Sequence, residues 1–96
     1  MQIAKVIGTT VSTIKDEKLV GRKLLIMRTA DENGEAIGKP YVAVDTLDAG
    51  VGDVVLTAHG SGGRQTEITK ESPVDAVIMA VVDHFEVGGT VTYRKS

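Results

Sequence analysis

A chain of 96 residues makes one domain, spanning 1–96, and buries only about two-thirds of its unfolded surface when it folds. Its stability is therefore marginal unless assembly supplements the core. The absence of cysteine excludes disulfides, thiol nucleophiles and thiolate metal sites, and it fits a cytosolic protein. A net charge of -2 with interspersed signs and 3% aromatic residues argue against nucleic-acid and anionic-membrane partners.

The first half of the chain predicts three short strands. Residues 3–13 alternate apolar with polar or small residues, and Gly8 interrupts them where a bulge or barrel corner would sit. Residues 23–29 and 40–47 are also rich in apolar and β-branched types. The Asn33-Gly34 pair between them predicts an exposed, charged hairpin loop.

The second half predicts a fourth strand at 54–59, and an organising strand at 77–87 that Gly88 and Gly89 end. Residues 90–94 alternate as a short terminal strand. Ser61 caps one helical turn that runs to about residue 66. We therefore predict a mainly β fold: a small, partly open, five-stranded OB-like β-barrel with one short helical turn and a C-terminal strand.

The apolar run at 73–83 organises the chain. Counting by two assigns Val77, Met79 and Val81 to one face and Ile78, Ala80 and Val82 to the other. Both faces are apolar, and a small barrel covers only the inner face of a strand. The outer face therefore needs a partner, and a second copy of the chain is the simplest choice.

One glycine-rich stretch is a candidate site: Gly60, Ser61, Gly62, Gly63 and Arg64. Its backbone N–H groups, hydroxyl and guanidinium would suit a phosphate or carboxylate. It lacks the lysine and spacing of a P-loop, however, and is not the dinucleotide fingerprint. We favour an inter-strand loop whose arginine makes an ion pair or hydrogen bonds between subunits.

The only histidines, His59 and His84, have no spacing typical of a metal site, so we predict no metal. Asp83 and His84 with Ser61 as nucleophile would resemble a catalytic triad, but nothing in the spacing demands it. We interpret both histidines as surface residues.

Three aspartates lie within or beside apolar strands: Asp45, Asp75 and Asp83. Such aspartates most often satisfy turn N–H groups or pair with a neighbour's arginine where an apolar surface ends. The candidate partners are Arg22, Arg28 and Arg64.

Six stretches, taken in order, resemble one protein family: residues 1–9, 19–25, 42–45, 49–55, 60–64 and 73–83. The set is similar to the pentameric vertex proteins of bacterial microcompartments, from carboxysome and ethanolamine-utilisation shells. The resemblance implies a non-enzymatic protein without cofactors, located in a microcompartment shell in the cytoplasm. Its partners would be four further copies of itself, in a homopentamer, and hexameric shell proteins, with no nucleic acid or membrane.

The resemblance also implies where subunits meet and where a central opening lies. The candidate residues are Gly60, Ser61, Gly62, Gly63, Arg64, Asp75, Ile78, Ala80, Val82 and Asp83. Two rival functions stay open: an OB-like module that binds nucleic acid or a small ligand, and a small hydrolase that uses Ser61.

Overall fold

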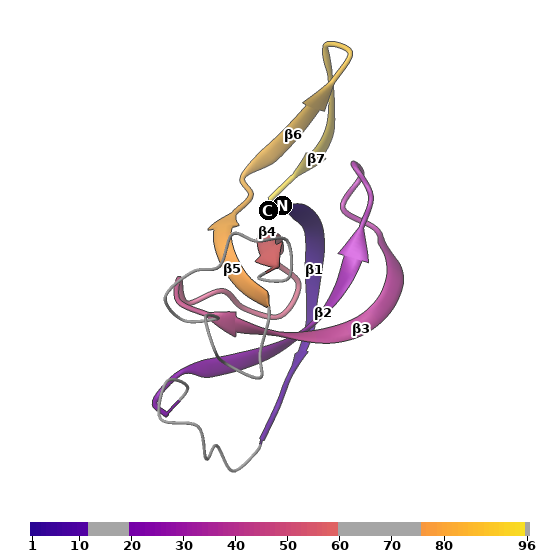
Figure 1. The fold of residues 1–96 in the computed structure, drawn as a ribbon. Helices are drawn as coiled ribbons and strands as arrows, with labels where there is room; N and C mark the ends of the chain where they lie inside the picture. The colour runs from indigo at the N-terminus through magenta and orange to yellow at the C-terminus, as the bar shows by residue number, and fades with distance from the viewer. Residues whose placement is uncertain (12–19, 60–75, 96) are drawn as a thin grey trace.

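The structure, a computed structural model, describes residues 1–11, 20–59 and 76–95. These residues form seven strands: β1 (Gln2–Thr9), β2 (Lys23–Ala30), β3 (Ala36–Asp45), β4 (Val54–His59), β5 (Ala76–Val81), β6 (His84–Val87) and β7 (Thr90–Arg94). Strands β1 to β5 form a barrel, and β6 and β7 form a hairpin that rises from it (Figure 1). The predicted five-stranded barrel is confirmed, but it is closed where a partly open one was expected. The predicted helical turn at 61–66 lies outside the described residues.

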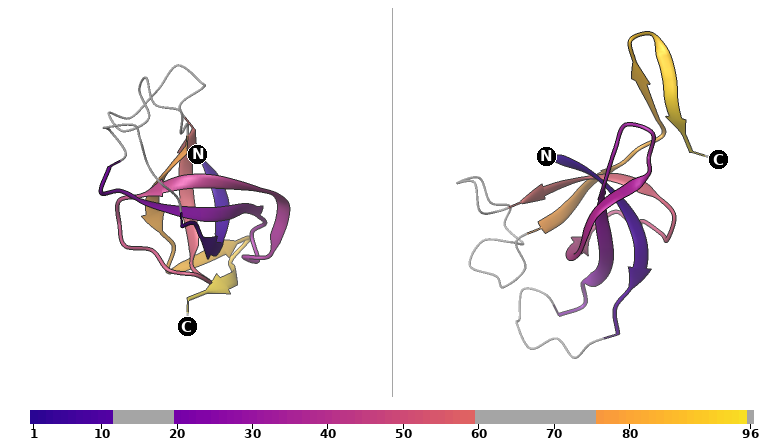
Figure 2. Two further views of the ribbon diagram at one scale, coloured as in Figure 1. Left: turned by 90° about the horizontal axis from the view of Figure 1, so that it is seen from below. Right: turned by 90° about the vertical axis from the view of Figure 1, so that its right-hand side faces the viewer.

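The barrel closes in the order β1-β2-β3-β5-β4 (Figure 2). All neighbours are antiparallel except β3 and β5, which pair in parallel at Val44 and Val77. Strand β3 begins at Ala36, so the prediction that it begins at Pro40 is wrong. Pro40 is tolerated inside the strand because it pairs only with Arg28 of β2, while its other edge has no partner among the described strands.

A β-bulge interrupts β1 where the sequence predicts one. The register between β1 and β2 shifts between Val6 and Gly8, so that Ile7 is the additional residue. A bulge increases local twist and bends the strand, which helps a short sheet close on itself. The strand ends at Thr9, earlier than the predicted residue 13.

The barrel interior is the hydrophobic core. It contains nine buried residues, joined by Tyr41 and Val81: Ala4, Val6, Leu25, Met27, Ala43, Ala49, Val55, Ala76 and Ile78. They combine small side chains, such as Ala4 and Ala43, with large ones, such as Leu25 and Met27, which together fill a narrow barrel.

The predicted strand at 77–87 is wrong in one respect, because the chain leaves the barrel after Val81. The amide of Val82 still donates to the carbonyl oxygen of Val54 at 2.8 Å, and the chain then turns at Asp83 into β6. The glycine break and the terminal strand are confirmed: Gly88 and Gly89, with φ of 59° and 82°, connect β6 to β7.

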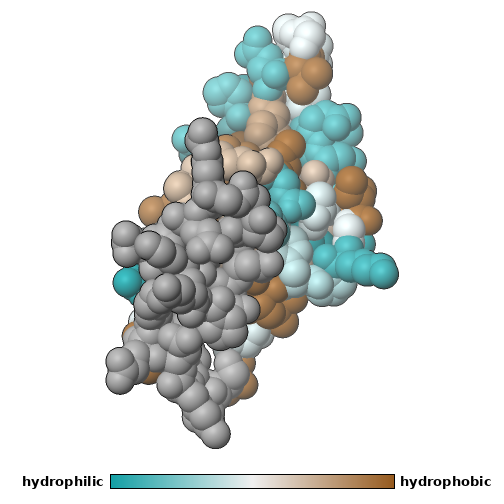
Figure 3. Space-filling view, viewed as in Figure 1, coloured by the Kyte–Doolittle hydropathy of each residue, from teal (hydrophilic) through white to brown (hydrophobic). Residues whose placement is uncertain are grey.

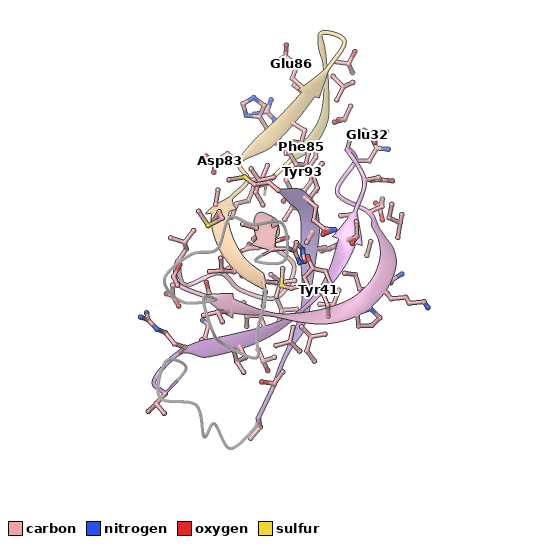
Figure 4. All side chains as sticks on the ribbon, viewed as in Figure 1. Glu32, Tyr41, Asp83, Phe85, Glu86 and Tyr93 are labelled. Atoms are coloured by element: carbon pink, nitrogen blue, oxygen red, sulfur yellow. The ribbon has the colours of Figure 1, made fainter. Side chains whose placement is uncertain are left out.

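The β6–β7 hairpin stands clear of the barrel and is supported by the tip of the β2–β3 hairpin (Figure 2). The hydroxyl of Thr92 donates to the carbonyl oxygen of Glu32 at 2.5 Å. The Phe85 and Tyr93 rings pack against each other in a tilted arrangement, with centroids 5.8 Å apart, and Figure 4 shows both close to the β2–β3 tip. Two hairpins, each marginal alone, thus support one another.

Candidate subunit interface

Four of the ten predicted site residues lie in the described part of the chain: Ile78, Ala80, Val82 and Asp83. The other six, Gly60, Ser61, Gly62, Gly63, Arg64 and Asp75, lie outside it. The site can therefore be built only from the end of β5 and the strands around it.

A second β-bulge, in β5, changes which residues share a face. Thr57 of β4 pairs with Ile78, whereas the preceding Leu56 pairs with Ala80, so Met79 is the additional residue. Ile78 and Val81 consequently both point into the core. The prediction that Ile78, Ala80 and Val82 share one face is wrong, because a bulge resets the alternation.

Of the four described candidates, Ala80 and Asp83 remain accessible. Ile78 is 1% exposed and Val82 is 8% exposed, so neither is available to a second subunit in this form. Met79, which sequence reasoning placed with Val77 and Val81, is 42% exposed. No single-sequence signal marks this bulge, because no glycine stands there as at Gly8.

The outer face of the barrel carries apolar residues in register, as the sequence predicts. One row crosses four strands: Leu24, Val44, Val77 and Ala58. Val44 and Val77 in this row are 0% and 3% exposed, so this part of the outer face is already buried within one copy. The expectation that all of the outer face needs a partner is therefore wrong for this row.

A second outer row, which we call the β4 row, consists of Ile3, Leu56 and Ala80. Ile3 pairs with Leu56 across β1 and β4, and Leu56 pairs with Ala80 across β4 and β5. Their neighbours Ala4, Val55 and Val81 point into the core, so the row itself faces outward. Met79 extends it.

A third outer row, the β2 row, consists of Gly8, Ile26 and Val42. Gly8 pairs with Ile26 and Ile26 with Val42, across β1, β2 and β3. Val42 and the bulged Ile7 beside the row are each 39% exposed. On the face seen in Figure 3, hydrophobic residues reach the surface in several places, separated by hydrophilic ones.

Charged groups flank both rows. Lys5 and Arg28 are directly opposite one another on the outer face of β1 and β2, beyond Ile26. Arg28 Nε donates to the carbonyl oxygen of Gly38 at 2.7 Å, and neither cation pairs with a carboxylate of the described residues. Asp83 is exposed at the junction of β5 and β6, on the side of the hairpin base away from Glu32 (Figure 4).

Asp45 satisfies a turn N–H group, as the sequence predicts, but the described cation beside it is Lys23 and not one of the predicted arginines. Its Oδ1 accepts the amide of Leu47 at 3.0 Å, and its Oδ2 lies 3.5 Å from Lys23 Nζ. Lys23 also donates to Asp48 Oδ1 at 3.0 Å. The hydrogen bond with Asp48 is the largest cause that raises the pKa of Lys23.

The two histidines differ. His84 is exposed, as predicted, but the Nε2 of His59 is buried and has no hydrogen-bond partner among the described residues. The His59 ring lies 5.3 Å from that of Tyr41, whose hydroxyl hydrogen-bonds Thr57 Oγ1 at 3.1 Å. Burial raises the pKa of Tyr41 more than this hydrogen bond lowers it.

The described residues include no group of three or more acidic or histidine side chains suited to a metal, and no helix suited to crossing a membrane.

Comparison with known proteins matches this architecture. The family profile described as "Ethanolamine utilisation protein EutN/carboxysome" matches residues 1–83. The carboxysome shell vertex protein CcmL of Nostoc sp. (strain PCC 7120) is 44% identical over 96 residues, covering 99% of this chain and 95% of the relative. A solved structure of the Nostoc CcmL superposes with a TM-score of 0.83, covering 99% and 100% of the two chains. The "GrpN pentameric microcompartment shell protein" of Rhodospirillum rubrum has a TM-score of 0.75 at 40% identity, covering 91% and 99%.

Proposed function

Because the chain belongs to the EutN/CcmL family, we propose that it is a structural shell protein whose homopentamers cap the five-fold vertices of a bacterial microcompartment. The observation that carries this proposal is the match, over 99% of the chain, to a protein named as a shell vertex protein. A pentameric shell protein with the same fold supports the stoichiometry.

The physical requirement for such a protein is geometric. A sheet of hexagonal units cannot close around a volume without pentagonal positions. Five copies can close a ring only through heterologous contacts, in which two different patches of each subunit fit one another. The separate β4 and β2 rows supply two such patches. Hexameric shell proteins are then the partners at the rim of the pentamer.

A catalytic role is not part of this proposal. The Nε2 atom of His59 is buried beside the Tyr41 ring, so it is not exposed to a substrate, and the candidate nucleophile Ser61 lies outside the described residues. Relatives of known function are named for their place in a shell.

The alternative of an OB-like module for nucleic acid has little support from the aromatic residues. Tyr41 packs against the core, and the tilted rings of Phe85 and Tyr93 pack against each other. All three aromatic side chains are therefore engaged within the chain, whereas single-stranded nucleic acid requires aromatic faces on which bases stack.

Native mass spectrometry of the purified protein tests the stoichiometry. We expect five copies per particle, and a monomer, dimer or hexamer as the dominant species at micromolar concentration would overturn the proposal. Co-expression with hexameric shell proteins tests the location, because closed particles should form with the chain present and remain open without it.

A further inference from the structure

We propose that neighbouring subunits contact one another through the β4 row of one copy and the β2 row of the next, with Asp83 of the first facing Arg28 and Lys5 of the second. This inference rests on the proposed pentamer and specifies its interface. It assigns different surfaces to the two sides of each contact.

The two rows face different directions. Strands β4 and β2 flank β1 on opposite sides in the barrel order, and each row is centred on one of them. The rows also meet β1 at different heights, since Ile3 and Gly8 are five residues, or about 17 Å, apart along an extended strand. Two apolar patches on different sides of one subunit form a head-to-tail contact, as a ring requires.

Both rows retain exposed apolar area in the single chain. Met79 and Val42 are 42% and 39% exposed, whereas Val44 and Val77 of the first row are nearly fully buried. An apolar partner is thus needed at the β4 and β2 rows and not at the row that contains Val44.

The charges at the ends of the rows are complementary. Lys5 and Arg28 are like charges directly opposite one another, an arrangement that is unfavourable unless an anion is nearby. Asp83 is an exposed carboxylate without an ion-pair partner among the described residues. It follows Ala80 by three residues and Arg28 follows Ile26 by two, so each charge lies within about 10 Å of its row. The apolar contact therefore brings opposite charges together.

Charge reversal tests the pairing. Asp83→Arg and Arg28→Glu should each raise the protein concentration at which half of the subunits are assembled by about tenfold or more, because close interfacial charge pairs couple strongly. The double variant should recover most of the wild-type assembly. Arg22→Glu and Glu35→Arg are the matched controls, since both side chains are exposed, make no ion pair in the described structure and lie outside the two rows. They should leave assembly unchanged.

Circular dichroism separates lost assembly from lost folding. If Arg28→Glu fails to fold because it loses the hydrogen bond from Arg28 Nε to the carbonyl oxygen of Gly38, Lys5→Glu takes its place, alone and combined with Asp83→Arg. Single variants that assemble like wild type, or a double variant no better than the weaker single variant, would overturn the assigned interface. A wild-type protein that is not pentameric would instead overturn the proposed function, so the two failures are distinguishable.

Discussion

The ring of Tyr93 lies directly over Gly34, which connects the projecting β6–β7 hairpin to the tip of the β2–β3 hairpin. A Cβ atom placed on Gly34 would lie 2.6 Å from Tyr93 Cδ1, closer than real contacts allow. Gly34 is buried and has a φ of 79°, which favours glycine. Its lack of a side chain therefore serves both the turn and the packing of the second hairpin.

Gly34→Ala should destabilise the protein by about 1–3 kcal/mol more than Gly21→Ala, because only the former adds overpacking to backbone strain. Gly21 is a matched control, since its φ is 81° and no atom lies within 4 Å of an added Cβ. Chemical denaturation at one fixed protein concentration measures the difference. Equal costs for the two variants would mean that Tyr93 does not pack on Gly34 in solution.

The sequence predicted this tip only in part. The Asn33-Gly34 pair indicates a turn, and the turn is present, with the amides of Asn33 and Glu35 both donating to Asp31 Oδ1. The prediction that the loop is simply exposed is wrong for Gly34. A contact between residues 34 and 93 depends on tertiary packing, which short-range patterns do not encode.

The candidate interface, like the hairpin tip, could be predicted from the sequence only in part. Alternation correctly indicated that β5 is apolar on both sides. It could not show that Met79 is a bulge residue, or that Ile3 and Leu56 align with Ala80, because both depend on strand register. The bulge in β1 was predictable because Gly8 marks it.

Two adjacent residues of β5 should respond differently to a buried charge. Ile78→Asp places a carboxylate in the core and should prevent folding, since the cost is several kcal/mol. Met79→Asp places it on the outer face, so the barrel should fold while the pentamer dissociates. Circular dichroism reports folding and native mass spectrometry reports assembly. A Met79→Asp variant that remains fully pentameric would exclude Met79 from the interface.

Tyr41→Phe should cost about 1 kcal/mol at neutral pH, because it leaves the hydroxyl of fully buried Thr57 without its partner. The free-energy cost of Tyr41→Phe should be smaller at alkaline pH. Burial raises the pKa of Tyr41 above 10.0, so the folded state keeps a proton that the unfolded chain loses. That contribution to stability is present below pH 10 and is lost as the pH rises further. The difference in unfolding free energy between wild type and Tyr41→Phe should therefore narrow above pH 10, and a constant difference would contradict the burial of the phenol.

Removing Lys23, the cation beside Asp45, should destabilise the barrel more than removing Asp48, the exposed anion that also pairs with Lys23. The Asp45 side chain is 1% exposed, and Lys23 Nζ at 3.5 Å is the nearest cation described near its Oδ2. Lys23→Met leaves that carboxylate buried without a counter-charge, whereas Asp48, at 96% exposure, forms a surface ion pair that solvent screens. In thermal unfolding, the Lys23→Met variant should have a lower melting temperature than the Asp48→Asn variant. Adding Asp45→Asn to Lys23→Met should restore stability, because the amide keeps the bond from Leu47 without the charge. If the double variant is instead less stable than Lys23→Met alone, the carboxylate stabilises the turn through more than its contact with Lys23.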